Sequence, residues 1–217
     1  MRREAFLGRV SAATLTGRFP EPPPVPAGLP EMPVADLITL FRTRAQAIST
    51  VVHGPISRHG VPRAVVGIAA GHGAASFLAW DELPVPGVSA ALQSTGCKRL
   101  VHVVPVESRI EHHLTYLDVA VGVTGADAAL AESGSVVLSH GPGRPRMASL
   151  APEVHVVLLE ADRIHRALAH WAHLEPGRAR ATANLVFVTG PSRTGDIEQR
   201  LNLGVHGPRH LHVVIIR

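Results

Sequence analysis

The C-terminal third of the chain combines a short apolar run with the residue types of an anion site. Residues 185–189 are apolar or β-branched and end at a Gly-Pro pair, a pattern typical of a buried strand that stops abruptly. Asp196, followed by Gln199, has the capping-box pattern of a helix start, so we expect a helix over 196–203. Free backbone N–H groups at such a start attract anions, and Arg193 adds a positive charge beside them. The sequence therefore predicts a carboxylate or phosphate site at this strand–turn–helix junction.

Two further turns carry polar residues where an expected strand or helix ends. An expected strand over 119–123 leads into a short helix over 126–132, which returns through a carboxylate, two hydroxyls and a glycine at residues 132–135. Residues 203–208 place a glycine C-cap signal and His206 directly before the last apolar run. Ligands gather at the carboxyl ends of strands in open α/β sheets, so we expect these turns to share one pocket with the first.

The elements that position these turns alternate along the chain. Residues 34–48 have the spacing of a helix with one buried face, and several valine-rich runs suit strands buried on both faces. The intervals around 135–138 and 154–159 lack a helix, so we expect an antiparallel or hairpin segment there. This alternation indicates an α/β sandwich with a mostly parallel sheet. The expected strands are residues 50–53, 64–69, 100–104, 119–123, 135–138, 154–159, 185–188 and 211–216, and the expected helices are residues 74–83, 88–95, 109–117, 126–132, 161–173 and 196–203.

The first 33 residues are expected to form a separate arm. Residues 2–15 have the apolar spacing of a short amphipathic helix, and the prolines of residues 20–33 indicate an extended, semi-rigid linker. We therefore divide the chain into an N-terminal helix with its linker, 1–33, and one domain, 34–217. The arm either docks on a neighbouring subunit or partner, or folds back onto its own domain.

Composition excludes several classes of protein. The chain has 217 residues, 46% of them hydrophobic and 18% charged, which is typical of a soluble globular protein with a sizeable core. No apolar run approaches the ~18 residues of a membrane helix, and no apolar segment follows the basic N-terminus, so we expect a cytoplasmic protein. The net charge is +4, Lys98 is the single lysine and the arginines are scattered, which argues against nucleic-acid binding.

Cysteine and histidine usage predicts no metal in this chain. Cys97 is the single cysteine, so an intrachain disulfide is excluded, and an iron–sulfur cluster normally needs four thiolates. The 14 histidines lack the spacing of a recognised metal-binding motif.

Five segments, in this order, closely resemble the LUD (lactate-utilisation) domain family, in particular its LutC/YkgG branch. The resemblance extends over about residues 119–216, and the opening helix at residues 3–10 is also similar to that branch. Residues 54–100 carry no matching motif. The matching segments are residues 123–127 (VTGAD), 131–135 (AESGS), 149–155 (SLAPEVH), 189–198 (TGPSRTGDIE) and 203–208 (LGVHGP).

The resemblance implies a three-layer sandwich like that of the NagB/RpiA sugar-phosphate isomerases and the CoA-transferases. It also implies a subunit of an L-lactate utilisation system, which supports oxidation of L-lactate to pyruvate. The implied partners are LutA- and LutB-like iron–sulfur proteins, which would carry 4Fe-4S clusters, and no cofactor is expected in this chain.

The three turns suggest how a small organic acid would be held. Arg193 and Ser192, with the Asp196 helix start, would bind a carboxylate, because the planar guanidinium pairs with it bidentately. Glu132 and His206 are the candidate catalytic residues, with His206 exchanging a proton with a substrate hydroxyl. Alternatively, Glu132 only caps the neighbouring helix. The candidate ligand-binding residues are Thr124, Gly125, Asp127, Ser133, Gly134, Ser135, Gly190, Ser192, Arg193, Thr194, Asp196 and Gly207.

Two other functions stay open. In the CoA-transferase fold a glutamate attacks an acyl group, and Glu132 is the candidate here for such acyl transfer. A non-catalytic assembly or regulatory protein, built on the arm and the sheet, is the other alternative. A homo-oligomer is expected if the strand over 211–216 lies at a sheet edge, and a central position is equally consistent with its composition.

Overall fold

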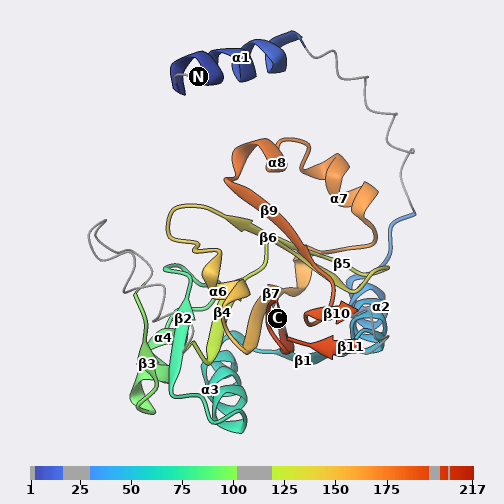
Figure 1. Ribbon diagram of the computed structural model, residues 1–217. Helices are drawn as coiled ribbons and strands as arrows, with labels where there is room; N and C mark the ends of the chain where they lie inside the picture. The colour runs from blue at the N-terminus through green and yellow to red at the C-terminus, as the bar shows by residue number, and fades with distance from the viewer. Residues whose placement is uncertain (1–2, 17–29, 102–118, 196–200, 205) are drawn as a thin grey trace.

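The structure is a computed structural model that describes residues 3–16, 30–101, 119–195, 201–204 and 206–217 (Figure 1). Its centre is a six-stranded sheet with the strand order β1-β12-β7-β4-β2-β3, and every pairing in it is parallel. The expectation of a mostly parallel α/β sheet is therefore confirmed. The strands of this sheet are β1 (Thr50–Ile56), β2 (Ser76–Ala79), β3 (Lys98–Arg99), β4 (Val121–Gly125), β7 (Val154–Glu160) and β12 (His210–Ile216).

A second, four-stranded sheet packs against one face of the parallel sheet, with the order β8-β5-β6-β9. Strand β6 pairs antiparallel with both β5 and β9, as expected for the segment around residues 135–138. The other segment of that expectation, residues 154–159, instead forms β7 in the middle of the parallel sheet. The strands of the second sheet are β5 (Ala128–Leu130), β6 (Ser135–His140), β8 (Ile164–His165) and β9 (Asn184–Val188).

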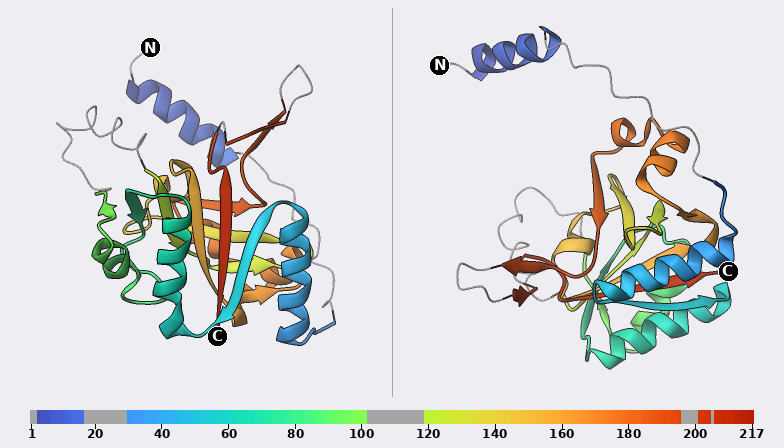
Figure 2. Two further views of the ribbon diagram at one scale, coloured as in Figure 1. Left: turned by 90° about the horizontal axis from the view of Figure 1, so that it is seen from below. Right: turned by 90° about the vertical axis from the view of Figure 1, so that its right-hand side faces the viewer.

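Helices complete the layers (Figure 2). Buried residues of α3 and α4 share one hydrophobic cluster with one face of the parallel sheet, and α2 shares another with the opposite face and the second sheet. None of the helices over the described residues combines the length and the hydropathy that a membrane crossing requires. The helical segments are α2 (Val34–Ala47), η1 (Arg58–Gly60), α3 (Val61–Gly71), α4 (Val88–Ser94), α6 (Met147–Leu150), η4 (Ala161–Arg163), α7 (Leu168–Leu174) and α8 (Arg178–Ala181), and a small hairpin is formed by β10 (Arg193–Gly195) and β11 (Leu201–Leu203).

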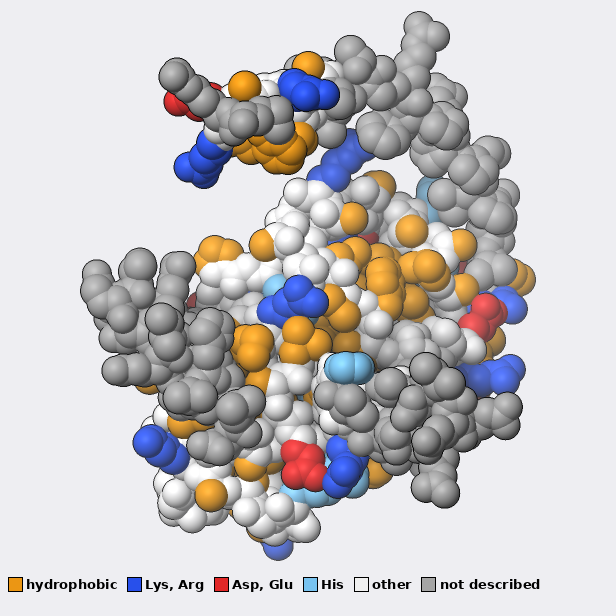
Figure 3. All heavy atoms as spheres, viewed as in Figure 1, with side chains coloured by type: hydrophobic (Ala, Val, Ile, Leu, Met, Phe, Trp, Pro, Cys, Tyr) orange, Lys and Arg blue, Asp and Glu red, His pale blue; other side chains and the backbone are white. Residues whose placement is uncertain are grey.

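The N-terminal arm contains the expected helix, α1 (Arg3–Thr16). Figures 1 and 2 show α1 standing apart from the two sheets. Its side chains Phe6, Leu7 and Val10 are about half exposed, and hydrophobic side chains gather on its underside in Figure 3.

One expected strand is a helix. Residues 64–69 lie in the middle of α3, which has a proline in its first turn. Its buried residues, Val61, Val65, Ile68 and Ala69, recur at helical spacing on one face. A run rich in valine is compatible with either element when it is short, and here the one-sided burial favours the helix.

Several expected helices are strands. Residues 74–83 contain β2, and 126–132 contain β5; both strands are buried along their whole length, so they lack the solvent-facing side of an amphipathic helix. The end of the helix expected over 196–203 is β11, which pairs antiparallel with β10. Strand β8 interrupts the helix expected over 161–173. The helix expected over 109–117, and residues 102–104 of an expected strand, lie outside the described residues.

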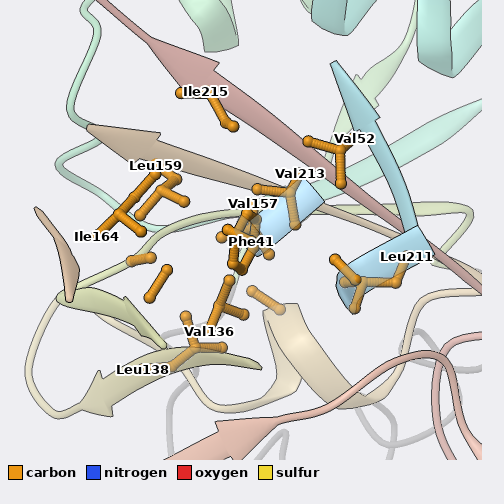
Figure 4. Packing of buried hydrophobic residues seen from close by; sticks show 14 of the residues in the cluster. Phe41, Val52, Val136, Leu138, Val157, Leu159, Ile164, Leu211, Val213 and Ile215 are labelled. Atoms are coloured by element: carbon orange, nitrogen blue, oxygen red, sulfur yellow. The ribbon is translucent and has the colours of Figure 1, made fainter. Parts of the chain in front are cut away.

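One of the two large hydrophobic clusters lies between the two sheets (Figure 4). Phe41 of α2 is fully buried among Val157 of β7, Val213 of β12 and Val136 of β6, which belong to one hydrophobic cluster. A close approach limits the spacing of α6 and the parallel sheet, because a Cβ added at Gly122 would lie 1.8 Å from the carbonyl oxygen of Ala148. Gly122 therefore sets how near α6 can pack.

We expect Gly122→Ala to lower the free energy of unfolding by about 3 kcal/mol, because the added methyl group must push α6 off the sheet. Gly67→Ala is the matched control: Gly67 is an exposed residue within α3 with open space around its Cα, so alanine should leave stability unchanged or raise it by up to ~1 kcal/mol. Urea denaturation of both variants measures the difference. Equal stabilities of the two variants would show that the contact at Gly122 relaxes without cost.

Candidate functional site

A cavity of about 240 Å³ lies at the carboxyl ends of three parallel strands. Trp80 follows β2, Gly125 ends β4 and Glu160 ends β7, and all three line it. Glu82, Asp127, Arg144 and Arg163 complete its polar lining. This is the edge of an open α/β sheet at which ligands normally bind. We call this cavity the carboxyl-edge pocket.

Arg144 is held in this pocket from two directions. Its Nη1 donates to Oδ1 of Asp127 at 3.0 Å, and its guanidinium carbon lies 4.8 Å from the centre of the Trp80 ring. The arginine side chain is 43% exposed, whereas the Asp127 side chain is 6% exposed. A cation held between a buried carboxylate and an aromatic face is pre-positioned, and its exposed N–H groups remain available to a ligand.

The Asp127 carboxylate is shared among several donors. The backbone N–H of Ser139 in β6 donates to its Oδ2 at 2.6 Å, and Nη1 of Arg178 lies 3.9 Å from its Oδ1. Arg163 donates to the backbone carbonyl of Asp127 at 3.4 Å, and among the described residues it has no carboxylate partner. Arg163 is thus a second guanidinium at the pocket whose charge is less fully compensated than that of Arg144.

Beneath the pocket, buried polar side chains pair with one another. Thr124 Oγ1 and His155 Nε2 lie 2.9 Å apart, and both residues are fully buried between the sheets. Burial lowers the pKa of His155 to about 3, with a smaller contribution from the nearby His140, so His155 is neutral near pH 7. Thr124, an expected ligand residue, therefore serves His155 and does not line the pocket, whereas Gly125 and Asp127 do line it.

Several residues that were expected to bind a ligand lie instead at the contact between the second sheet and α2. The hydroxyls of Ser133, Ser135 and Thr189 form a chain with distances of 2.8 Å at each step. Gly134 and Gly190 have positive φ angles, and a Cβ on either would lie under 3 Å from the backbone of α2 or of the residue after it. These residues make close contacts between backbones, for which glycine and small hydroxyl side chains are required.

Glu132 lies apart from the carboxyl-edge pocket. Its Oε1 accepts a hydrogen bond from Nε of Arg166 at 2.9 Å, and its side chain is 46% exposed. In the structure the partner of Glu132 is therefore the Arg166 side chain, and not the backbone N–H groups that a helix cap would supply.

Arg193 and its neighbours belong to the β10–β11 hairpin. Arg193 donates to the Ser49 hydroxyl at 2.7 Å, and the Ser192 backbone N–H donates to the carbonyl of Pro208. Thr194 lies within β10. Asp196, the expected helix start, lies outside the described residues, and the helix expected to follow it is replaced at its end by β11.

His206 and Gly207 line a different cavity, of about 570 Å³, near the amino ends of β4, β7 and β12. Glu153 and Arg209 also line it, and they form an exposed ion pair of 3.6 Å. The residues expected in one pocket are therefore distributed over the carboxyl-edge pocket, the contact with α2 and this amino-edge cavity.

The sequence patterns did not indicate Trp80, Arg144, Arg163 and Glu160 as residues of the site. Trp80 was hidden because residues 74–83 were expected to be a helix, so no strand end was recognised there. Arg144 lies in a Gly- and Pro-rich turn, and such loops carry binding residues more often than regular elements do. That signal could have indicated Arg144.

Comparisons with known proteins place the chain in a family. A protein named "Lactate utilization protein C" from Geobacillus sp. (strain WCH70) is 29% identical over 157 residues, which cover 69% of this chain and 65% of that protein. One of the same name from Exiguobacterium sp. is 35% identical over 100 residues, 44% of each chain. The match thus covers less than two thirds of the length of each of these relatives.

A solved structure has the same fold. The crystal structure of a DUF162 family protein from Deinococcus radiodurans superposes with a TM-score of 0.67 at 20% identity, covering 86% of this chain and all of the other. The family model described as the LUD domain matches residues 41–216, and the chain therefore belongs to the LUD domain family.

Proposed function

We propose that this chain is a subunit of a lactate-utilisation system and supports the oxidation of L-lactate to pyruvate together with iron–sulfur partner proteins. The names of its relatives support a role in lactate utilisation. The single cysteine of the sequence supports a division of labour, because a 4Fe-4S cluster normally needs four thiolates. In this proposal the oxidation of lactate to pyruvate releases two protons to solvent and two electrons, which 4Fe-4S clusters on LutA- and LutB-like partners would take up, and this chain contributes no redox cofactor.

We further propose that the carboxyl-edge pocket binds the small carboxylate of this system. The observation that carries this proposal is Arg144, fixed between Asp127 and the Trp80 ring with part of its guanidinium exposed. A guanidinium binds a carboxylate through paired, charge-assisted hydrogen bonds. Arg163, at the same pocket, supplies a second cation, and a cavity of about 240 Å³ suits an organic acid of few atoms.

The acidic side chains of the pocket give the bound molecule its orientation. Asp127 is already occupied by its donors, whereas Glu82 also lines the cavity and is able to accept a hydrogen bond from a ligand hydroxyl. Glu160 is paired with Arg58 at 2.6 Å. A 2-hydroxy acid would thus place its carboxylate at the arginines and its hydroxyl toward Glu82.

A non-catalytic assembly role is the second candidate, and α1 favours it. The exposed Phe6 and Leu7 give the arm an apolar surface, which is typical of a segment that binds another protein. Acyl transfer by Glu132 has no comparable support, because Glu132 is an exposed residue paired with Arg166.

We expect Arg144→Gln to weaken binding of L-lactate or pyruvate by about 10- to 100-fold, because a charge-assisted hydrogen bond contributes about 1.5–3 kcal/mol. Isothermal titration calorimetry measures this. Arg166→Gln is the matched control, since Arg166 pairs with Glu132 away from the pocket, and its affinity should equal that of the wild type. Equal affinities of all three proteins would place the acid elsewhere.

Growth on L-lactate as sole carbon source tests the role of the protein in the cell. In a host that lacks other copies, we expect deletion of the gene to abolish growth, and the wild type and Glu132→Gln to restore it. We expect Arg144→Gln, at equal abundance, to fail. If Arg144→Gln also restores growth, the assembly role is favoured. Growth of the deletion strain itself would refute the lactate proposal.

A further inference from the structure

Three histidines from separate elements meet on the face of the parallel sheet that α3 covers. His53 lies on β1, His212 lies on β12, and His72 follows the last residue of α3. His53 Nε2 is 3.0 Å from Nδ1 of His212, and His72 Nε2 is 3.1 Å from Nε2 of His212. Both nitrogens of His212 are therefore used, and the three rings form a continuous hydrogen-bonded chain. We call it the histidine chain.

Ring geometry supports hydrogen bonding within this chain. The His53 and His212 ring planes are within 13° of parallel, but their centroids are 5.3 Å apart while the bonded nitrogens are 3.0 Å apart. The two rings therefore meet edge to edge. The His72 and His212 rings are nearly perpendicular, at 84°, with centroids 5.2 Å apart. Both ring nitrogens of His212 point toward the neighbouring rings, and among the described residues no three ligating side chains are arranged around a common point as a metal site requires.

Counting protons shows how this chain responds to acid. Each ring–ring hydrogen bond needs one proton between its two nitrogens, and each end of the chain has one outer nitrogen. The intact chain thus has places for four protons, of which three neutral imidazoles supply three. One additional proton leaves both hydrogen bonds in place. A second one puts two N–H groups face to face, so one hydrogen bond must break.

The surroundings oppose additional charge. Burial, and then the charge of Arg42 on α2, lower the pKa of His53, and burial lowers the pKa of His212 to about 4 with further contributions from His53, His72 and His210. Next to the chain, burial, His72 and Arg209 lower the pKa of His210 on β12, and Glu153 opposes them. Because these folded-state pKa values lie below 6.5, the unfolded chain binds more protons. The stabilisation is therefore complete above about pH 6.5 and is lost as the pH falls toward 4.

We propose that His53, His212 and His72 form an acid-sensitive latch that holds the edge strand β1 and the end of α3 on β12, and that opens when a second additional proton enters the chain. β1 pairs with β12 and with no other described strand, so its place in the sheet depends on this side. His72 is exposed and gives protons access to the buried His212. The latch lies away from the carboxyl-edge pocket and does not depend on the proposed function.

Hydrogen exchange of backbone amides, followed by NMR between about pH 7 and pH 5, tests the latch. After correction for intrinsic exchange rates, we expect the opening constant of the β1 amides to rise about tenfold or more per pH unit. The amides of β7, in the middle of the same sheet, serve as an internal reference for global unfolding and should rise less.

Two variants separate the latch from general acid sensitivity. In His53→Gln the glutamine side chain is able to donate to His212 or to accept from it, so this hydrogen bond persists in either protonation state of His212. The backbone amides of β1 should then follow those of β7 at every pH. His59→Gln is the control, because His59 is an exposed histidine outside the chain and should behave as the wild type. If β1 follows β7 in the wild type, or if His53→Gln opens like the wild type, the latch is refuted.

Ring ¹⁵N shifts of the wild type give a second measurement that needs no variant. We expect the rings of His53, His72 and His212 to shift together as the first proton is shared along the chain. Three independent titrations near the ordinary pKa of histidine would overturn the proposal.

Discussion

The buried carboxylate of Asp127 is the constraint on which the arrangement of the two sheets depends. It lies between the end of β4 and the start of β5, at the step of the chain from one sheet into the other. There it accepts a backbone N–H from Ser139 in β6 and a guanidinium N–H from Arg144. A buried charge is tolerated only when its hydrogen bonds are complete, so the position of Arg144 and the path of β6 are coupled through this one group. The geometry of the carboxyl-edge pocket is a consequence of that coupling.

How much of the fold could be predicted from the sequence depended on the length and regularity of each apolar pattern. The parallel strand β12 and the helix α2 were predictable, because a long valine- and isoleucine-rich run and a regular 3,4-spacing each point to one structure. Strand β12 proved to be central, between β1 and β7, so the edge-strand argument for a homo-oligomer does not apply to it. The run within α3 and the four residues of β2 were too short for periodicity to decide, and both were assigned to the wrong element.

The candidate site was only partly predictable for a different reason. Gly134 and Gly190 have the local pattern of ligand-binding turns, yet each permits a close approach of two backbones near the end of α2. The sequence does not distinguish a glycine that makes room for a ligand from one that makes room for the protein itself. Conversely, Trp80 and Arg144 are 64 positions apart in the chain, so their contact (4.8 Å from the guanidinium to the ring) depends on the tertiary fold. Gly125 and Asp127 line the carboxyl-edge pocket because Gly125 ends β4 and Asp127 follows it by two residues.

Two kinds of histidine environment in this protein differ in their capacity to respond to protons. His155 is fully buried, and its Nε2 pairs with a hydroxyl, which is able to donate or to accept and therefore adapts to either protonation state. The histidine chain has imidazoles on both sides of each hydrogen bond, so the number of protons it holds is limited. Burial, with a smaller contribution from His140, keeps His155 neutral, whereas in the histidine chain an exposed ring connects a buried one to solvent. Sensitivity to acid thus requires both a path for protons and hydrogen-bond partners that are unable to take up further protons without breaking the bond, and in this fold the two conditions meet between β1, β12 and the end of α3.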